Sequence, residues 1–144
     1  MMNLDYKIKA IWLSMSKMYN QIASDHDVTQ TVVSVLLIVP KEGLPATQIA
    51  PLLGMEATSM SRVFNSMEKK GLISRIPCGD DKRVVNVYLT KEGIKQRKNA
   101  KKIVEDFNDH IKHQIPQNKM SIFMEVLDLI ESSTEEYKEI NKLL

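Results

Sequence analysis

The sequence has a single cysteine, Cys78, and only five glycines among 144 residues. One cysteine cannot form an intrachain disulfide, so a disulfide-stabilised fold is excluded and a reducing, cytoplasmic compartment is expected. No GxGxxG, P-loop or GxSxG motif is present, and the cysteine and three histidines have no catalytic spacing. We therefore expect neither an enzyme nor a bound cofactor.

Long apolar runs are also missing. No run of about 18 apolar residues occurs, so no membrane-spanning helix and no membrane partner is predicted. The first residues, Met1–Lys7, lack the basic stretch and apolar core of a signal peptide. With 43% apolar and 26% charged residues, the chain has the composition of one globular domain.

The net charge is only +2, but the charges are unevenly distributed. Residues 57–83 and 95–102 are rich in bases, whereas the segment from Asn118 onward is mainly acidic. Such a distribution favours a polyanionic partner for one part of the molecule, although a solvated charged face produces the same pattern.

Four longer segments are predicted to be helical. Apolar residues at intervals of three and four predict a helix over Tyr6–Ser24, and Thr90 is expected to cap another that ends near His113. Residues 30–40, preceded by capping residues at 27–29, are apolar on nearly all sides, which predicts a central helix, although the valines also suit a strand. The last helix, from about residue 118, is expected to bury Ile122, Phe123, Val126, Leu127, Ile130 and Tyr137.

Two short helices between these segments suggest a helix-turn-helix. The first is predicted over Gln48–Leu53, with Thr47 as its cap and Gly54 at its end. The second is predicted over residues 57–70 and stops at Gly71. Helices of this length joined by a tight turn are typical of major-groove readers of DNA.

The polar face of the second short helix carries side chains that can contact DNA. Thr58, Ser59, Ser61, Arg62 and Asn65 are all predicted to lie outside its apolar stripe. Arginine pairs with guanine, asparagine with adenine, and serine or threonine with bases or phosphates. An ordinary solvated helix face is the alternative interpretation.

A predicted β-hairpin follows this helix directly. Residues 72–76 and 84–89 are its strand candidates, and the segment 77–83 between them is its turn. Lys82 and Arg83 would contact phosphates or a minor groove, and Asp81 would orient the Arg83 guanidinium. Arg75, in the first strand, is also assigned to DNA binding.

Several motifs resemble the MarR family of transcriptional regulators. The segment 49–63 is similar to its helix-turn-helix, and residues 67–75 are similar to its "LEKKGLIxR" run. Asp81-Lys82-Arg83 followed by 89–93 matches the wing pattern "DxR" leading into "LTxxG". The resemblance covers roughly residues 28–93, and the joint spacing of the motifs is more specific than a lone helix-turn-helix.

The resemblance implies a mainly α, six-helix fold with a small β-hairpin wing. It implies one domain, with a winged helix-turn-helix over residues 28–93 and dimerisation helices over 1–27 and 94–144. It further implies a homodimer that binds a near-palindromic double-stranded operator, usually as a repressor relieved by a small-molecule inducer or an oxidant. On matching positions Ser59, Ser61 and Arg62 contact bases or phosphates, while Arg83 is the wing arginine and Asp81 its partner.

The apolar residues of the terminal helices support a dimer independently. Trp12, Met15, Tyr19, Phe123 and Leu127 are more than a lone winged domain can cover. Trp12, Met15 and Tyr19 are also candidates for lining a ligand pocket, although such a stripe is more often core or interface.

Three alternatives remain at this point. Cys78 would be a redox switch if its thiol were activated by neighbouring bases. His110 and His113, with Asp106 and Asp109, have helical spacings that could bind zinc, but solvated helix residues have the same spacing, and no metal site is assigned. The winged helix could also bind a protein rather than DNA.

Overall fold

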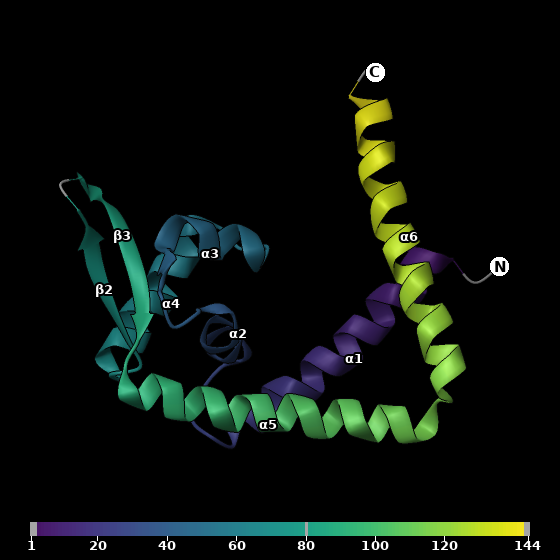
Figure 1. The fold of residues 1–144 in the computed structure, drawn as a ribbon, viewed down its shortest axis with the longest axis horizontal. Helices are drawn as coiled ribbons and strands as arrows, with labels where there is room; N and C mark the ends of the chain where they lie inside the picture. The colour runs from purple at the N-terminus through teal and green to yellow at the C-terminus, as the bar shows by residue number, and fades with distance from the viewer. Residues whose placement is uncertain (1–2, 80, 143–144) are drawn as a thin grey trace. The chain divides into compact units, whose positions relative to one another are not determined.

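The computed structural model describes residues 3–79 and 81–142, and for residues 81–83 it describes only the backbone. Its elements are α1 (Leu4–Ser24), α2 (Gln30–Ile38), β1 (Leu44–Pro45), α3 (Ala46–Leu52), α4 (Ala57–Lys69), β2 (Ile73–Cys78), β3 (Asp81–Leu89), α5 (Lys91–Gln114) and α6 (Gln117–Asn141) (Figure 1). Two compact units divide after Lys101, within α5. The predicted six-helix architecture with a small β-hairpin is confirmed.

The core of the first unit is built around α2. Thr29 begins this helix by accepting a hydrogen bond from the Val32 N–H, at 3.3 Å, through its side-chain oxygen. Val35, Leu36 and Val39 are almost completely buried, so the prediction of a central apolar helix is confirmed. The other buried apolar residues of this cluster are Val32, Ile49, Ala50, Met60, Phe64, Met67, Leu72, Ile73 and Val87.

The wing is a longer hairpin than the sequence predicts. Strands β2 and β3 pair in antiparallel fashion from Ile73–Leu89 outward to Cys78–Asp81, and the register shifts between Pro77 and Cys78. Cys78 therefore ends a strand, whereas we expected it in the turn. The sequence does not reveal that the ladder continues past Pro77, which has no N–H to donate, because it does so through a shift in register.

A third strand was not predicted. β1 has only two residues, Leu44 and Pro45, and it pairs with Val87 and Asn86 at the free edge of β3. The sheet order is therefore β1-β3-β2. The sequence suggests only a chain break here, because two residues are too few to show alternation.

The cap predicted for the first short helix is wrong. Thr47 lies inside α3, which begins one residue earlier, and the N-cap residue is Pro45, without a side-chain capping bond. Proline has a fixed φ suited to the residues that begin a helix, so the chain enters α3 directly from β1. The other predicted helix ends agree with the structure within about three residues.

The start of α5 is joined tightly to the end of α4. The Thr90 hydroxyl donates to the Gly71 carbonyl at 2.5 Å and accepts from the Gly93 N–H at 3.0 Å, which confirms Thr90 as the cap. The Thr90 N–H donates to the Leu72 carbonyl at 3.1 Å. Farther along, Arg97 Nη1 donates to the Val39 carbonyl at 2.9 Å, so α5 is anchored to the end of α2.

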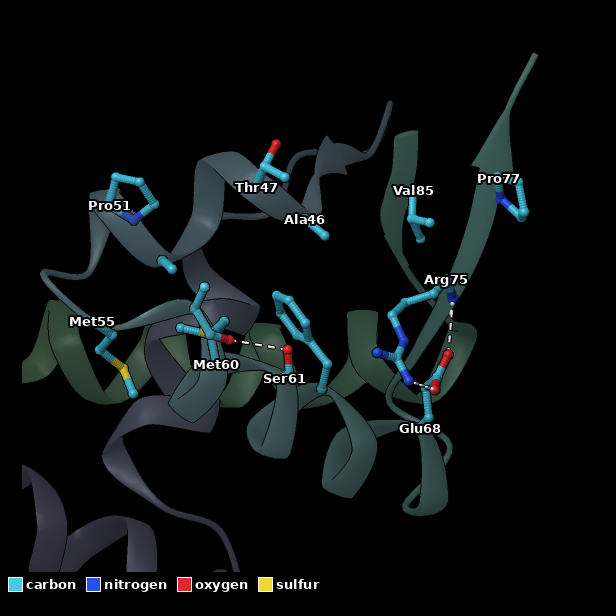
Figure 2. A pocket seen from close by; sticks show the side chains of 13 residues that line it. Ala46, Thr47, Pro51, Met55, Met60, Ser61, Glu68, Arg75, Pro77 and Val85 are labelled. Atoms are coloured by element: carbon cyan, nitrogen blue, oxygen red, sulfur yellow. Dashed lines mark hydrogen bonds and ion pairs between the residues drawn. The ribbon is translucent and has the colours of Figure 1, made fainter. Parts of the chain in front are cut away.

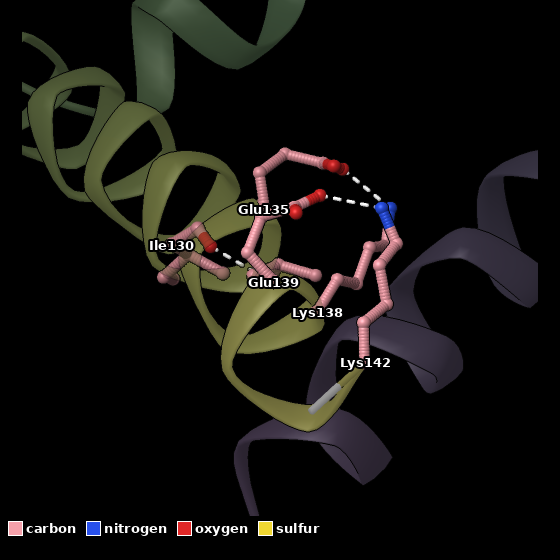
Figure 3. Close-up of polar contacts among 6 residues, drawn as sticks. Ile130, Glu135, Lys138, Glu139 and Lys142 are labelled. Carbon is pink, nitrogen blue, oxygen red and sulfur yellow. Dashed lines mark hydrogen bonds and ion pairs between the residues drawn. The ribbon is translucent and has the colours of Figure 1, made fainter. Parts of the chain in front are cut away.

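Helix α6, in the second unit, does not bury the residues that we expected it to bury. None of its residues, all of which are described, is buried in the single chain, and Ile122, Phe123 and Tyr137 are each more than half exposed. Another part of its surface is polar. Figure 3 shows two ion pairs there, Glu135 with Lys138 and Glu139 with Lys142, each at 2.5 Å.

Candidate nucleic-acid interface

Helix α4 has one buried face and one exposed polar face. Met60, Phe64 and Met67 recur at intervals of four and three and are almost fully buried, so they fix the rotation of the helix against the core. The helix ends at Gly71, whose φ of 67° is unfavourable for other residues. The Gly71 and Leu72 N–H groups donate back to Glu68 and Met67, which closes the last turn and confirms the predicted stop.

The candidate DNA-reading side chains of α4 are all exposed. Thr58, Ser61, Arg62 and Asn65 lie on the side opposite the buried methionines, and Ser59 lies at the margin of this face. The Ser61 hydroxyl donates to the Ala57 carbonyl at 3.0 Å, so only its oxygen lone pairs remain for a ligand. The structure therefore brings these five residues together, and their DNA contacts stay a prediction.

Arg75 connects the wing to α4. Its Nη2 atom donates to Glu68 Oε2 at 2.5 Å and to Asn65 Oδ1 at 2.7 Å, and its backbone N–H donates to Glu68 Oε1 at 3.2 Å. We call Asn65, Glu68 and Arg75 the Arg75 network. Arg75 was predicted to bind DNA, but in this structure its guanidinium faces two side chains of α4.

The side-chain hydrogen bond from Arg75 lowers the pKa of the Glu68 carboxyl, and the same bond raises the pKa of the Arg75 guanidinium. Sequence reasoning missed Glu68. The signal available was its spacing of seven residues from Arg75 across Gly71, which returns the strand to the end of the helix.

The Glu68 carboxylate is expected to stabilise the fold near neutral pH and not in acid. Its pKa is lowered by folding, so the contribution is complete above the ordinary value of 4.5 and disappears as the pH falls through the lower folded value. Glu68→Gln should reduce the free energy of unfolding at pH 7 by at most about 1 kcal/mol, because the ion pair is partly exposed. Urea denaturation at pH 7 and at progressively lower pH measures the difference.

Glu42→Gln, which neutralises an exposed carboxylate on the turn after α2, is the control and should change little at either pH. An unfolding difference for Glu68→Gln that persists unchanged in strong acid would contradict the ionic origin of the contribution.

A cavity of about 700 Å³ lies between α3, α4 and the wing strands. Figure 2 shows Met60 and Ser61 of α4 and Pro51 of α3 around it, with the Arg75–Glu68 pair on the wing side. Its lining is mainly apolar.

The pocket candidates from the sequence lie elsewhere. Trp12, Met15 and Tyr19 are on α1 and do not line the cavity; Trp12 is 61% exposed, and Met15 and Tyr19 are half-buried. Partial burial raises the pKa of the Tyr19 phenol. Their role in ligand binding therefore remains a prediction.

The wing residues Asp81, Lys82 and Arg83 are at the start of β3, but their side chains lie outside the described residues. Cys78 is exposed.

Among the described side chains, no group of three or more His, Cys, Asp and Glu residues is placed to hold a metal ion. His113 Nδ1 lies 2.6 Å from the Asp109 carbonyl oxygen within its own helix. No helix in the described part of the chain has the length and apolarity needed to span a bilayer.

The two short helices, the buried α2 and the three-stranded sheet define a winged helix-turn-helix protein. The family model named MarR matches residues 28–85. These residues, which form the winged helix-turn-helix, are therefore similar to the MarR family of transcriptional regulators. The resemblance predicted from the sequence motifs is confirmed.

Known proteins are similar to this chain, and the solved structures among them share its fold. An uncharacterised HTH-type transcriptional regulator of Bacillus subtilis, YpoP, is 22% identical over 110 residues, which cover 76% of this chain and 72% of that protein. MepR of Staphylococcus aureus, in a crystal structure with DNA, is similar with a TM-score of 0.80, 23% identity and coverage of 93% and 99% of the two chains. Reduced MarR of E. coli gives a TM-score of 0.77 at 19% identity, covering 90% of this chain and 97% of its own.

Proposed function

We propose that this chain is a homodimeric regulator of transcription that binds double-stranded DNA sequence-specifically, with α4 in the major groove. The observation that carries the proposal is the exposed face of Thr58, Ser61, Arg62 and Asn65 on a helix whose opposite face is locked in the core. Hydroxyl, guanidinium and amide groups are those that read base edges in that groove. The similar MepR has been crystallised with DNA, which supports the same use of the fold here.

The dimer is proposed from apolar surface that the single chain leaves uncovered. On α1, Tyr6 and Trp12 are 72% and 61% exposed, and on α6 Leu129 is 65% exposed. Apolar surface of this extent normally lies in an interface. In our proposal residues 1–27 and 94–144 form the interface, and two-fold symmetry places two recognition helices about one turn of DNA apart, on the half-sites of a near-palindromic operator in the cytoplasm.

We also propose that the protein is a repressor relieved by a small molecule. Repression is what the MarR resemblance implies, and the cavity between α4 and the wing supports regulation by a ligand. Its volume of about 700 Å³ is in the range of small-molecule sites, and two of its walls are the elements assigned to DNA. An occupant there would compete with DNA for the same face.

Selection of bound fragments from a random DNA pool tests the DNA proposal. The expected result is a near-palindrome whose binding weakens steeply with salt, because Lys and Arg contacts release counterions from the phosphates. A winged-helix module that binds only proteins would select no sequence. A pool that shows no enrichment therefore contradicts the proposed function.

Arg62→Ala is expected to weaken binding to the selected operator by about 1–3 kcal/mol and to relax the preference at one base position in each half-site. The reason is that Arg62 is exposed on α4, and a guanidinium can donate two hydrogen bonds to the N7 and O6 atoms of guanine. Fluorescence anisotropy on single-base operator variants measures both effects. Arg83→Ala, in the wing, should instead weaken binding to all sequences more evenly.

The matched control is Lys41→Ala, which removes an exposed positive charge from the turn after α2 and should leave the preference for every base unchanged. If Arg62→Ala binds as tightly and as selectively as the parent, the assignment of α4 as the reading helix is wrong.

A further inference from the structure

The amide of Asn65 has a fixed orientation in this structure. Arg75 Nη2 lies 2.7 Å from Asn65 Oδ1. A guanidinium carries donors and no acceptor, so the amide atom facing it has to be the oxygen. Turning the amide by half a rotation would bring donors against donors and would remove a charge-assisted hydrogen bond.

Glu68 holds the side chain of Arg75 in place, and Arg75 in turn sets the orientation of the Asn65 amide. The Nη2 atom has two hydrogens, and the two acceptors on it are Glu68 Oε2 and Asn65 Oδ1. Glu68 Oε1 accepts from the Arg75 backbone N–H, so one carboxylate holds both the strand and the end of the side chain. Because Glu68 is on α4, one turn beyond Asn65, all three groups are set by the junction between helix and wing.

On the basis of the proposed function, we infer that Arg75 and Glu68 are positioning residues that direct Asn65 to read base edges through its Nδ2 donors. With Oδ1 directed at Arg75, the Nδ2 hydrogens are the part of the amide left for a base, and Asn65, like Arg62, is exposed. When an amide reads adenine, the amide oxygen accepts from adenine N6 and the amide nitrogen donates to adenine N7. Guanine presents only acceptors, N7 and O6, in the major groove, so it requires only donors from the amide. Asn65 should therefore favour guanine, in contrast to the adenine expected from the sequence.

The test uses the full-length protein and the operator selected from the random pool. Asn65→Ala first identifies the base position that Asn65 reads, because that position loses its preference. At this position the parent should prefer guanine, and Arg75→Met should lower the guanine-to-adenine affinity ratio about tenfold. Arg75→Lys keeps a donor and a positive charge beside Oδ1 and should retain the preference. Lys41→Met is the control for the loss of one positive charge.

Each outcome decides the inference. The inference is overturned if the parent protein prefers adenine at this position. It is also overturned if the affinity of Arg75→Met falls equally for all four bases, or if Asn65→Ala loses base preference at no position of the operator. If Arg75→Met fails to fold, as judged by thermal melting, Asn65→Asp replaces it, because position 65 is exposed. An aspartate has only acceptors, so guanine preference should give way to cytosine, which presents the N4 donor; retained guanine preference overturns the inference. A parent that selects no DNA at all overturns the proposed function as well.

Discussion

Leu129→Glu is expected to make the protein monomeric and to weaken its binding to a palindromic operator by about 10²–10⁴-fold. The reason lies in a stripe along α6. Ile122, Val126, Leu129, Tyr137 and Ile140 recur at helical spacing on one side, and each is at least 43% exposed in the single chain. In a two-fold contact the same patch is used by both subunits, so one substitution introduces two carboxylates into the apolar interface.

The polar side of α6 identifies which face is left for a partner. The ion pairs Glu135–Lys138 and Glu139–Lys142 (Figure 3) are on the opposite side of the helix by sequence spacing, and all four side chains are more than half exposed. A helix with one charged and one apolar side, neither of them buried by its own chain, is stable only if the apolar side is covered. Because two linked half-site contacts bind far more tightly than one, loss of the dimer reduces DNA affinity without any change to α4.

Sedimentation velocity gives the oligomeric state, and gel-shift titration gives the affinity for the full operator and for a half-site. The matched control is Met124→Glu, which places the same acidic side chain at a 51% exposed apolar position on the other side of α6. It should remain dimeric and bind normally. A Leu129→Glu protein that stays dimeric and keeps its operator affinity would show that the stripe is not the interface.

The features that the sequence predicted well are those governed by local rules. Helix α4 follows from the spacing of Met60, Phe64 and Met67 and from the glycine at 71, since burial and a left-handed terminal residue are both readable from residue type. The long α5 follows from Thr90 for the same reason, because its capping bond joins residues three apart. The exposed face of α4, which carries the candidate DNA-reading side chains, is the part of the helix outside this buried stripe.

The features that were missed depend on contacts between distant segments. The strand β1 exists only because Leu44 finds the free edge of β3 at Val87. Asn65 and Arg75 are each assigned to DNA binding from the sequence, but the register of the hairpin decides that they meet Glu68 and that Arg75 turns toward α4. Phe123 and Tyr137 are exposed in the single chain, because the pattern shows which side of α6 is apolar and not which chain covers it.

Gly93→Ala is expected to destabilise the fold by about 1–3 kcal/mol, although alanine is normally the better helix former by about 1 kcal/mol. Gly93 is buried in the first turn of α5, where a Cβ atom would lie 2.0 Å from the Leu72 carbonyl oxygen. That oxygen accepts the Thr90 N–H at 3.1 Å, and the neighbouring Gly71 carbonyl accepts the Thr90 hydroxyl. Backbone cannot move away like a flexible side chain, so relieving the overlap requires opening the junction between α4, the wing and α5.

Thermal and urea denaturation should therefore show a melting temperature several degrees lower for Gly93→Ala than for the parent. The control is Gly54→Ala at the end of α3, where the added Cβ meets no atom within 4 Å and only the positive φ of 61° opposes it. Gly54→Ala introduces backbone strain without atomic overlap, so it should lose less stability than Gly93→Ala. The sign of the Gly93→Ala effect is the sharpest readout, because a helical glycine with free space around it gains stability on replacement by alanine. A raised melting temperature would mean that α5 does not approach Leu72 this closely, and that the cap at Thr90 does not hold helix, wing and recognition helix as one body.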